Sequence, residues 1–508
     1  MKEKKVIEID GRTGEGGGQL VRVAVALAAL TSQPIRITNV RGNRGDGRKG
    51  GGLKSQHLTA IAWLATATNA QVTGLSIGSS VLEFRPQQAP SASTHLSLRA
   101  LERGPDQPPA RLAIAAESAA ASTLLVFQAI LPFLLFADTG ADDHAVPGLS
   151  AAIGVDISGG TNVSFAPSFE YVDQVLLPAL EARFAGLTVE RRLVCRGWSA
   201  GTPATRGRVE FAVRPLRVGA ALQRRRRGHD DDNDNDDDDD DNLDVAAVDA
   251  SVVVPADMHA ALTRAIARDL DDMWPGVEVA FPVLEDSGSD ARVYVLLVAK
   301  SEAGSRRWGR DVLTSVPARK AKDGGGGKTK CKSKGKTADG GDRGDRGKEA
   351  YAEEISRDVV RELFEEVALG GDGDVYLQDQ LVIFQALAEG RTSFVRQTDQ
   401  EREDDGEDGS PPRGGGGGSS DVPPSPRNRD KMLETAMGAL SVQQLQQQQQ
   451  GRMRKDKARE PFGNGSLHAK TARWVTAELL PKVAWYNKGK ICDGAGFSVT
   501  KGMMGAAD

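Results

Sequence analysis

Four low-complexity segments limit which parts of this chain can build a folded core. They are an Arg run followed by an Asp run at 224–242, a Gly/Lys/Asp mixture at 319–349, an acidic and then Gly/Ser/Pro-rich stretch at 397–432, and a Gln run at 443–450. Such compositions carry too little apolar surface to offset the entropy lost on ordering. We therefore predict that these segments are disordered and loop out from a core built by the rest of the chain.

The remaining blocks alternate strand and helix patterns. Residues 6–10 and 34–40 read as strands, and each is followed by a helical pattern, at 19–31 and 55–70. Further helices are expected in four places: 117–137, 350–367, 376–389 and 468–486. The apolar run at 292–299 indicates a buried strand. This order predicts an α/β (α+β) fold of sheets backed by helices.

Charge and cysteine content limit the partners that the protein could bind and the compartment in which it could fold. The net charge is −5, yet residues 1–60 carry eleven Lys/Arg against five Asp/Glu, so a basic surface is compatible with the sequence. Three widely spaced cysteines give neither a disulfide framework nor a zinc signature. A signal-peptide pattern and an apolar run long enough to span a bilayer are both lacking. We expect an intracellular protein with no membrane partner.

The first chemical motif lies between a strand and a helix at residues 10–19, DGRTGEGGGQ. Glycines allow a sharp turn, and a helix N-terminus can bind an anion. Glu15 could hold a divalent metal beside phosphates, and Arg22, Arg41 and Arg44 could form a phosphate clamp. A plain Gly-rich turn with solvated arginines fits the same spacing.

Two further motifs lie near the starts of later helices. Tyr376, Asp379 and Gln380 share one helical face, where a ring could stack on a base and the polar groups could bind a nucleotide. His468 opens the last long helix, with Ser466 as the expected cap. The helix dipole should lower the pKa of the His468 imidazole and favour its nucleophilic form. Taken one at a time, these motifs are explained better by an ordinary amphipathic helix and a structural histidine.

Together, and in this order, the motifs resemble the RNA 3′-terminal phosphate cyclase family. The resemblance covers the folded blocks from the opening IEIDGRTGEGGGQLVRVAVALAALTSQPIRITNVRGNR onward. It continues in LKSQHLTA (53–60), LLVFQ (124–128), GGTNVSFAP (159–167), YLQDQL (376–381) and SLHAKT (466–471).

The resemblance implies repeated small units, each a four-stranded sheet backed by two helices, with a smaller inserted α/β domain. The expected organisation is a core at 5–218, the inserted domain at 219–318, a linker at 319–349, core again at 350–396, an insertion at 397–459 and core at 460–500.

The resemblance also implies an ATP-dependent ligase-class enzyme that converts an RNA 3′-terminal phosphate to a 2′,3′-cyclic phosphate. His468 would carry AMP covalently. The implied nucleotide contacts are Gln128, Pro167, Tyr376, Asp379 and Gln380. Glu15 would associate with a divalent metal (Mg or Mn), and Arg22, Arg41 and Arg44 would bind the RNA phosphate. The implied partner is an RNA 3′-phosphate end, and the implied location is the nucleus.

Two other functions are compatible with a chain of this type. A non-catalytic relative could use the same fold as a scaffold in ribosomal RNA processing, but it would lack the nucleophilic histidine and the Tyr376 face. An enolpyruvyl transferase is built from similar units, but it needs neither ATP nor a histidine nucleophile. Transfer of label from α-labelled ATP to the protein separates both from the cyclase.

Overall fold

The computed structural model describes most of the expected core. The described residues are 4–44, 50–93, 111–138, 152–201, 203–225, 244–302, 304–317, 342–396 and 453–499, with side chains from 347 onward in the 342–396 segment. Residues 319–341 and most of the other three low-complexity segments lie outside this part of the chain, so the disorder expected of them stays a prediction. The linker prediction is wrong for residues 342–349, which form the first turns of a helix that runs on to Ala368.

Two four-stranded sheets form the N-terminal half of the core. The first has the order β1-β2-β4-β3, from Ile7–Asp10, Ile35–Thr38, Leu82–Arg85 and Gln71–Thr73. The second has the order β5-β6-β9-β8, from Arg111–Ala115, Ile153–Gly159, Gly207–Val213 and Val189–Cys195. In each sheet one parallel pair, β1 with β2 and β5 with β6, brackets a helical connection.

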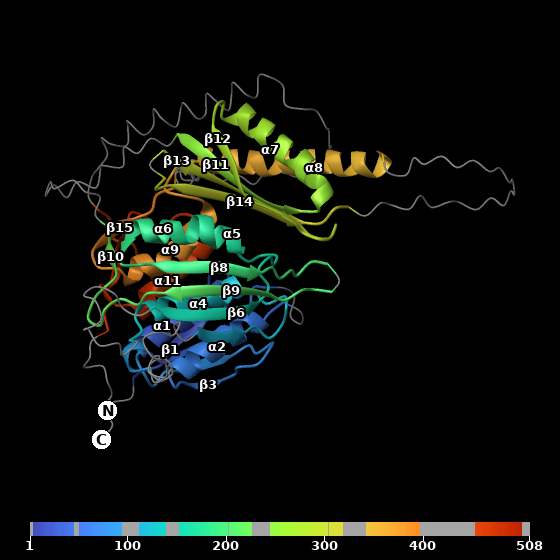
Figure 1. The fold of residues 1–508 in the computed structure, drawn as a ribbon. Helices are drawn as coiled ribbons and strands as arrows, with labels where there is room; N and C mark the ends of the chain where they lie inside the picture. Colours follow the sequence, from blue (N-terminus) through green and yellow to red (C-terminus); the bar gives the residue numbers. More distant parts are fainter. Residues whose placement is uncertain are drawn as a thin grey trace, which may run out of the picture.

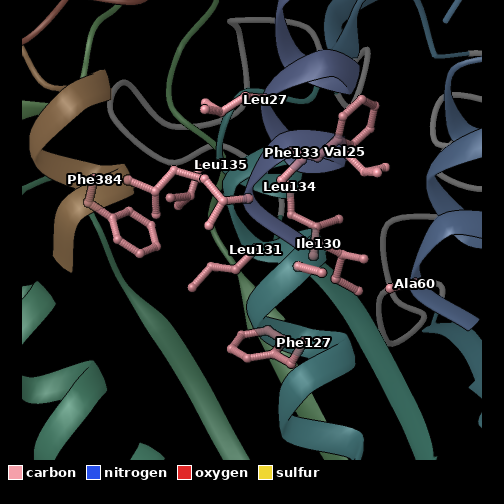
Figure 2. Close-up of a cluster of buried hydrophobic side chains, with 14 of the residues drawn as sticks. Val25, Leu27, Ala60, Phe127, Ile130, Leu131, Phe133, Leu134, Leu135 and Phe384 are labelled. Atoms are coloured by element: carbon pink, nitrogen blue, oxygen red, sulfur yellow. The ribbon is translucent and has the colours of Figure 1, made fainter. Parts of the chain in front are cut away.

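Helices pack between these sheets because their sequences are apolar on nearly every side. They are α1 (Gly18–Thr31), α2 (Ser55–Ala67) and α4 (Thr123–Leu135). The short α5 (Phe169–Tyr171) and α6 (Leu177–Arg183) follow along the chain and lie beyond β8 (Figure 1). Figure 2 shows Ile130, Leu131 and Leu134 of α4 among side chains of α1, α2 and α9. The expected helix at 117–137 is thus shorter than predicted, because Ser122 caps its start.

A third unit combines segments from both sides of the long low-complexity insertion. Its helices are α9 (Val375–Leu387) and α11 (Leu467–Leu479), and its three described strands are ordered β15-β17-β16. These strands are Arg391–Ser393, Ile491–Asp493 and Ala484–Tyr486. The expected helix at 468–486 ends at Leu479, since residues 484–486 enter the sheet. Pairing of β15 with β17 brings the chain before the insertion next to the chain after it.

The inserted sheet has the order β12-β11-β13-β14, from Glu278–Asp286, Val245–Val254, Val293–Ser301 and Arg307–Thr314. Val295 and Leu297 pack under α7 (His259–Met273) and α8 (Asp342–Ala368), whereas Tyr294 and Leu296 pack against the core. Burial on both faces explains why this strand reads as a continuous apolar run. Figure 1 shows this sheet stacked on the core beside α5 and α6.

Helix α8 differs from the sequence-based organisation. We grouped residues 350–396 as one core unit, but Ile355 and Val359 belong to the apolar cluster of the inserted sheet. Only the part from α9 onward packs in the third unit. The α/β class, with four-stranded sheets and paired helices, is confirmed. No described helix is long and apolar enough to cross a membrane.

A composite site at three helix N-termini

Glu15 lies at the centre of the candidate site, on the Gly-rich turn before α1. Gly14 has φ +68°, and a Cβ on it would lie 2.1 Å from Thr471 Oγ1, so only glycine allows α11 to come this close. The Thr471 hydroxyl accepts a hydrogen bond from the Glu15 backbone N–H at 3.0 Å. The turn is therefore shaped to meet α11, more than 450 residues along the chain.

The buried Glu15 carboxylate joins three segments. Its Oε2 lies 2.7 Å from Arg44 Nη2 and 3.3 Å from His468 Nε2, and its Oε1 accepts a hydrogen bond from the Gln19 N–H at 3.2 Å. Burial would raise the pKa of Glu15, but the bonds from His468 and Arg44 outweigh it and lower the pKa to about 2. The carboxylate is therefore ionised, and it accepts the N–H of Gln19 at the start of α1.

His468 is held in the first turn of α11. Ser466 caps this helix and accepts a hydrogen bond from the Ala469 N–H at 3.0 Å, as expected from the sequence. The predicted lowering of the His468 pKa is wrong for the free protein. The hydrogen bond to Glu15 raises that pKa, and the opposing effect of burial is smaller. The side chain is 43% exposed, so the ring can be approached from solvent.

The three arginines converge as the sequence predicted. Arg22 is partly buried in α1, and burial together with the nearby Arg41 lowers its pKa to about 10, against the opposing influence of Glu15 and Asp379. The pKa of Arg41 is lowered by burial and by Arg44. Arginines that repel one another in a partly buried site are arranged to receive an anion.

A chain of polar side chains runs from the arginines to α9. Arg22 Nε donates to Gln128 Oε1 at 3.0 Å, Gln128 donates to Gln380, and Gln380 Nε2 donates to Asp379 Oδ1 at 2.8 Å. Burial raises the pKa of Asp379 to about 7, against the opposing influence of His468. The structure thus joins Gln128 of α4 to the motif in α9.

Tyr376 and Pro167 lie at the rim of this arrangement. Tyr376 is 53% exposed in the first turn of α9. Pro167 is half-buried directly before Ser168, which caps α5. In the same short helix, the Tyr171 hydroxyl donates to Asp374, the cap of α9, at 2.8 Å. The loop that carries Pro167 is therefore anchored at the start of the Tyr376 helix.

Sequence reasoning missed His57. The Lys54 backbone N–H donates to its Nδ1 at 3.1 Å, which places the proton on Nε2, and this buried Nε2–H has no partner in the structure. Burial, together with Arg22 and Arg41, lowers the pKa of His57 to about 3. Its neighbours come from another helix, so local sequence gave no sign of them. The start of α2 contributes a neutral donor to this site.

Glu15 is the carboxylate that we expected to hold a metal ion. Within the described ranges, no group of three or more His, Cys, Asp or Glu side chains converges on a possible ion position. Mg²⁺ is commonly held by one or two carboxylates together with substrate phosphates. Glu15 is an ionised, buried carboxylate beside three arginines. It could therefore bind a metal ion that is also coordinated by substrate phosphates, but it could not hold one by protein ligands alone.

Fold and site together define an α+β protein of repeated sheet–helix units, with arginines, a carboxylate and an imidazole gathered at the N-termini of α1, α9 and α11. The sequence profile of "RNA 3'-terminal phosphate cyclase" matches residues 13–403. The chain belongs to this family. His468 lies beyond the matched range, so its place beside Glu15 comes from the structure.

Curated relatives agree with the family assignment. The chain is similar to the RNA 3'-terminal phosphate cyclase of Staphylothermus marinus, at 28% identity over 76% of this chain and 86% of the relative. The protein of that name from Archaeoglobus fulgidus is 28% identical over 77% of this chain and 90% of its own length. The one from Ignicoccus hospitalis is 37% identical over 42% of this chain and 48% of its own length.

Proposed function

We propose that this protein uses ATP to convert an RNA 3′-terminal phosphate to a 2′,3′-cyclic phosphate through a covalent histidine–AMP. One observation carries the proposal. The His468 Nε2 lies 3.3 Å from the Glu15 carboxylate, at a site that also contains three arginines and the α9 motif. A nucleophile, an anion-binding cluster and a candidate base-stacking ring thus come together from distant parts of the sequence.

In the first step, His468 Nε2 forms a bond to the α-phosphorus of ATP, and the bond to pyrophosphate breaks. Glu15 raises the pKa of His468, so a proton on Nε2 has to leave to solvent before the ring attacks. Arg44 and Arg41, which we expect to bind the RNA phosphate, would also offset the charge of the departing pyrophosphate. A divalent ion at Glu15 would supply further neutralisation of phosphate charge.

In the second step, an oxygen of the RNA 3′-phosphate attacks the same phosphorus and releases the imidazole. The 3′-phosphate is now joined to AMP, which is a good leaving group. The neighbouring 2′-oxygen then attacks the 3′-phosphorus, loses its proton and expels AMP. Arg22 would hold the RNA phosphate through both transfers, and its hydrogen bond to Gln128 supports this role.

We propose that Tyr376 and Pro167 contact the base, and that Asp379 and Gln380 contact the rest of the nucleotide. The exposed ring of Tyr376 and the pairing of Gln380 with Gln128 support these roles. The proposed partner is therefore an RNA 3′-phosphate end. A nuclear location is part of the proposal from family resemblance, and imaging of a tagged protein tests it.

The function is tested with a short RNA that ends in a 3′-phosphate. Incubation with the protein, ATP and Mg²⁺ should make the terminal phosphate resistant to phosphatase, and the product should be a cyclic phosphate by mass. An otherwise identical RNA with a 2′-deoxy terminus should stop as the adenylated end, because the attacking oxygen is missing. RNA binding without any new product would favour the non-catalytic scaffold and refute the proposal.

A further inference from the structure

The inserted sheet reaches the candidate nucleotide site through β14. Two consecutive residues of this strand contact the start of α9. The Gly309 N–H donates to Asp374 Oδ2 at 2.9 Å, and the Arg310 guanidinium lies over the Tyr376 ring, 5.1 Å from its centroid. The strand thereby holds both the cap of α9 and the ring in its first turn.

Arg310 is itself held firmly on the protein side. Its side chain is 13% exposed and pairs with Glu366 of α8, which also accepts a hydrogen bond from Arg396 Nη2 at 2.5 Å. A second Arg310 nitrogen donates to the Gly309 carbonyl at 3.0 Å. The guanidinium is therefore fixed in position by contacts that do not involve a ligand.

Arg310 covers one face of the Tyr376 ring, while the residue as a whole stays largely exposed. A guanidinium over an aromatic ring is attracted by the negative π face, and the attraction strengthens when the pair is shielded from water. Tyr376 is still 53% exposed, so a second planar group can reach it. A ring clamped from behind also loses less rotamer freedom when a base stacks on it.

We propose that Arg310 is a positioning residue for the nucleotide, and that it backs the Tyr376 ring so that the purine of ATP stacks on the opposite face. The inserted domain thereby forms part of the nucleotide site and sets its affinity. This inference rests on the proposed use of ATP and adds a residue to it from a domain that carries none of the sequence motifs.

The test compares Arg310→Met with Arg310→Lys, which keeps the charge beside Glu366 but lacks the planar group. The KM for ATP in protein adenylation should rise roughly 3- to 30-fold in Arg310→Met, less in Arg310→Lys, with kcat nearly unchanged. Transfer of AMP from already adenylated protein to RNA should keep its wild-type rate. Arg361→Met, an exposed α8 arginine paired with Asp358, is the matched control and should keep the wild-type KM.

A double-mutant cycle separates ring positioning from general damage to the fold. In a Tyr376→Leu background, Arg310→Met should add little to the KM for ATP, because its partner ring is already gone. An equal rise in both backgrounds, or an unchanged KM in Arg310→Met, would overturn the inference.

Calorimetric titration with ATP in the His468→Ala protein reports on the same contact without the covalent step. Suppose that Arg310→Met weakens the binding of ATP to this protein, and that the wild type forms no AMP adduct. The role of Arg310 is then supported, and the proposed histidine chemistry is refuted. If Arg310→Met leaves this affinity unchanged, the inference fails, and adduct formation by the wild type still supports the proposed function.

Discussion

The two helices that carry the predicted nucleotide contacts and the predicted nucleophile begin in different ways. The Asp374 carboxylate caps α9 and accepts four hydrogen bonds, from the backbone N–H groups of Tyr376, Leu377 and Gly309 and from the Tyr171 hydroxyl. The Ser466 hydroxyl caps α11 and accepts one, from the Ala469 N–H.

This difference separates two tasks within one site. The start of α9 is fixed by a fully buried carboxylate that joins the core, the inserted sheet and the helix itself. The start of α11 keeps a simple cap and leaves His468 partly exposed, with Glu15 as the group that orients the ring. We infer that α9 provides a rigid wall and that α11 provides an accessible reactive group.

The largest predicted effect concerns the reactive group of α11. His468→Ala should reduce transfer of label from α-labelled ATP to the protein to background, because His468 is the group that carries AMP in this scheme. His259→Ala is the control, since the His259 ring is hydrogen-bonded to the carbonyls of Val254 and Glu285 in the inserted sheet, and its variant should label normally. Normal labelling of the His468 variant would contradict the assignment.

The next largest effect is expected on stability, at the Asp374 cap of α9. Asp374→Ala leaves a buried tyrosine hydroxyl and the Gly309 N–H without their acceptor, and should lower the free energy of unfolding by roughly 2–4 kcal/mol. Urea denaturation followed by circular dichroism measures it. Asp374→Asn keeps one acceptor oxygen and should cost less. Equal losses for the two variants would show that the four bonds are not what fixes α9.

A titration sharpens the role of Glu15. Glu15→Gln should lower the pKa of His468, measured by NMR of the imidazole carbon-bound protons in metal-free protein, because the group that raises this pKa is removed. Glu83→Gln, which weakens the partly buried pair with Arg85 in the first sheet, should leave it unchanged. An unaltered His468 pKa in Glu15→Gln would mean that the carboxylate does not control this ring.

The same pair predicts how stability depends on pH. The contribution of His468 is fully present below its unfolded-state pKa and is lost as pH rises through its raised folded-state pKa. The contribution of Glu15 is present above its unfolded-state pKa and is lost as pH falls toward about 2. The stability advantage of the wild type over Glu15→Gln should therefore be largest in mildly acidic solution.

The smallest effect is expected at the simple cap. Ser466→Ala removes one hydrogen bond at the start of α11 and should lower the free energy of unfolding by about 1 kcal/mol. Ser466→Asp, which retains a capping oxygen, serves as its control in the same urea titration. A loss as large as that of Asp374→Ala would remove the contrast between the two helix starts.

Local patterns predicted those parts of the fold that depend on local periodicity. The helix at 19–31 and the strand at 292–299 were found because their apolar residues repeat with the period of the element or fill both of its faces. The end of α11 was misplaced because Trp485 packs in a sheet whose partner strand follows later. Helix α8 was assigned to the third unit, although it packs on the inserted sheet. An amphipathic pattern shows that a helix has a buried face, but it does not show which element covers that face.

For the candidate site, too, local signals could be predicted from the sequence and contacts between distant elements could not. His468, Tyr376 and the arginines were found because each lies in a motif with its own local signal. His57 and Arg310 were missed because what surrounds them comes from other elements. The direction of the His468 pKa shift was wrong for the same reason. The expected influence was its own helix, and the dominant one is a carboxylate near the other end of the chain.

The measurement that tests this account most directly is the location of AMP on the protein. After incubation with ATP and Mg²⁺, and digestion under conditions that preserve phosphoramidates, mass spectrometry should find the AMP adduct on the peptide that contains His468. An adduct on any other residue, or no adduct in a protein that still cyclises RNA, would contradict the central claim.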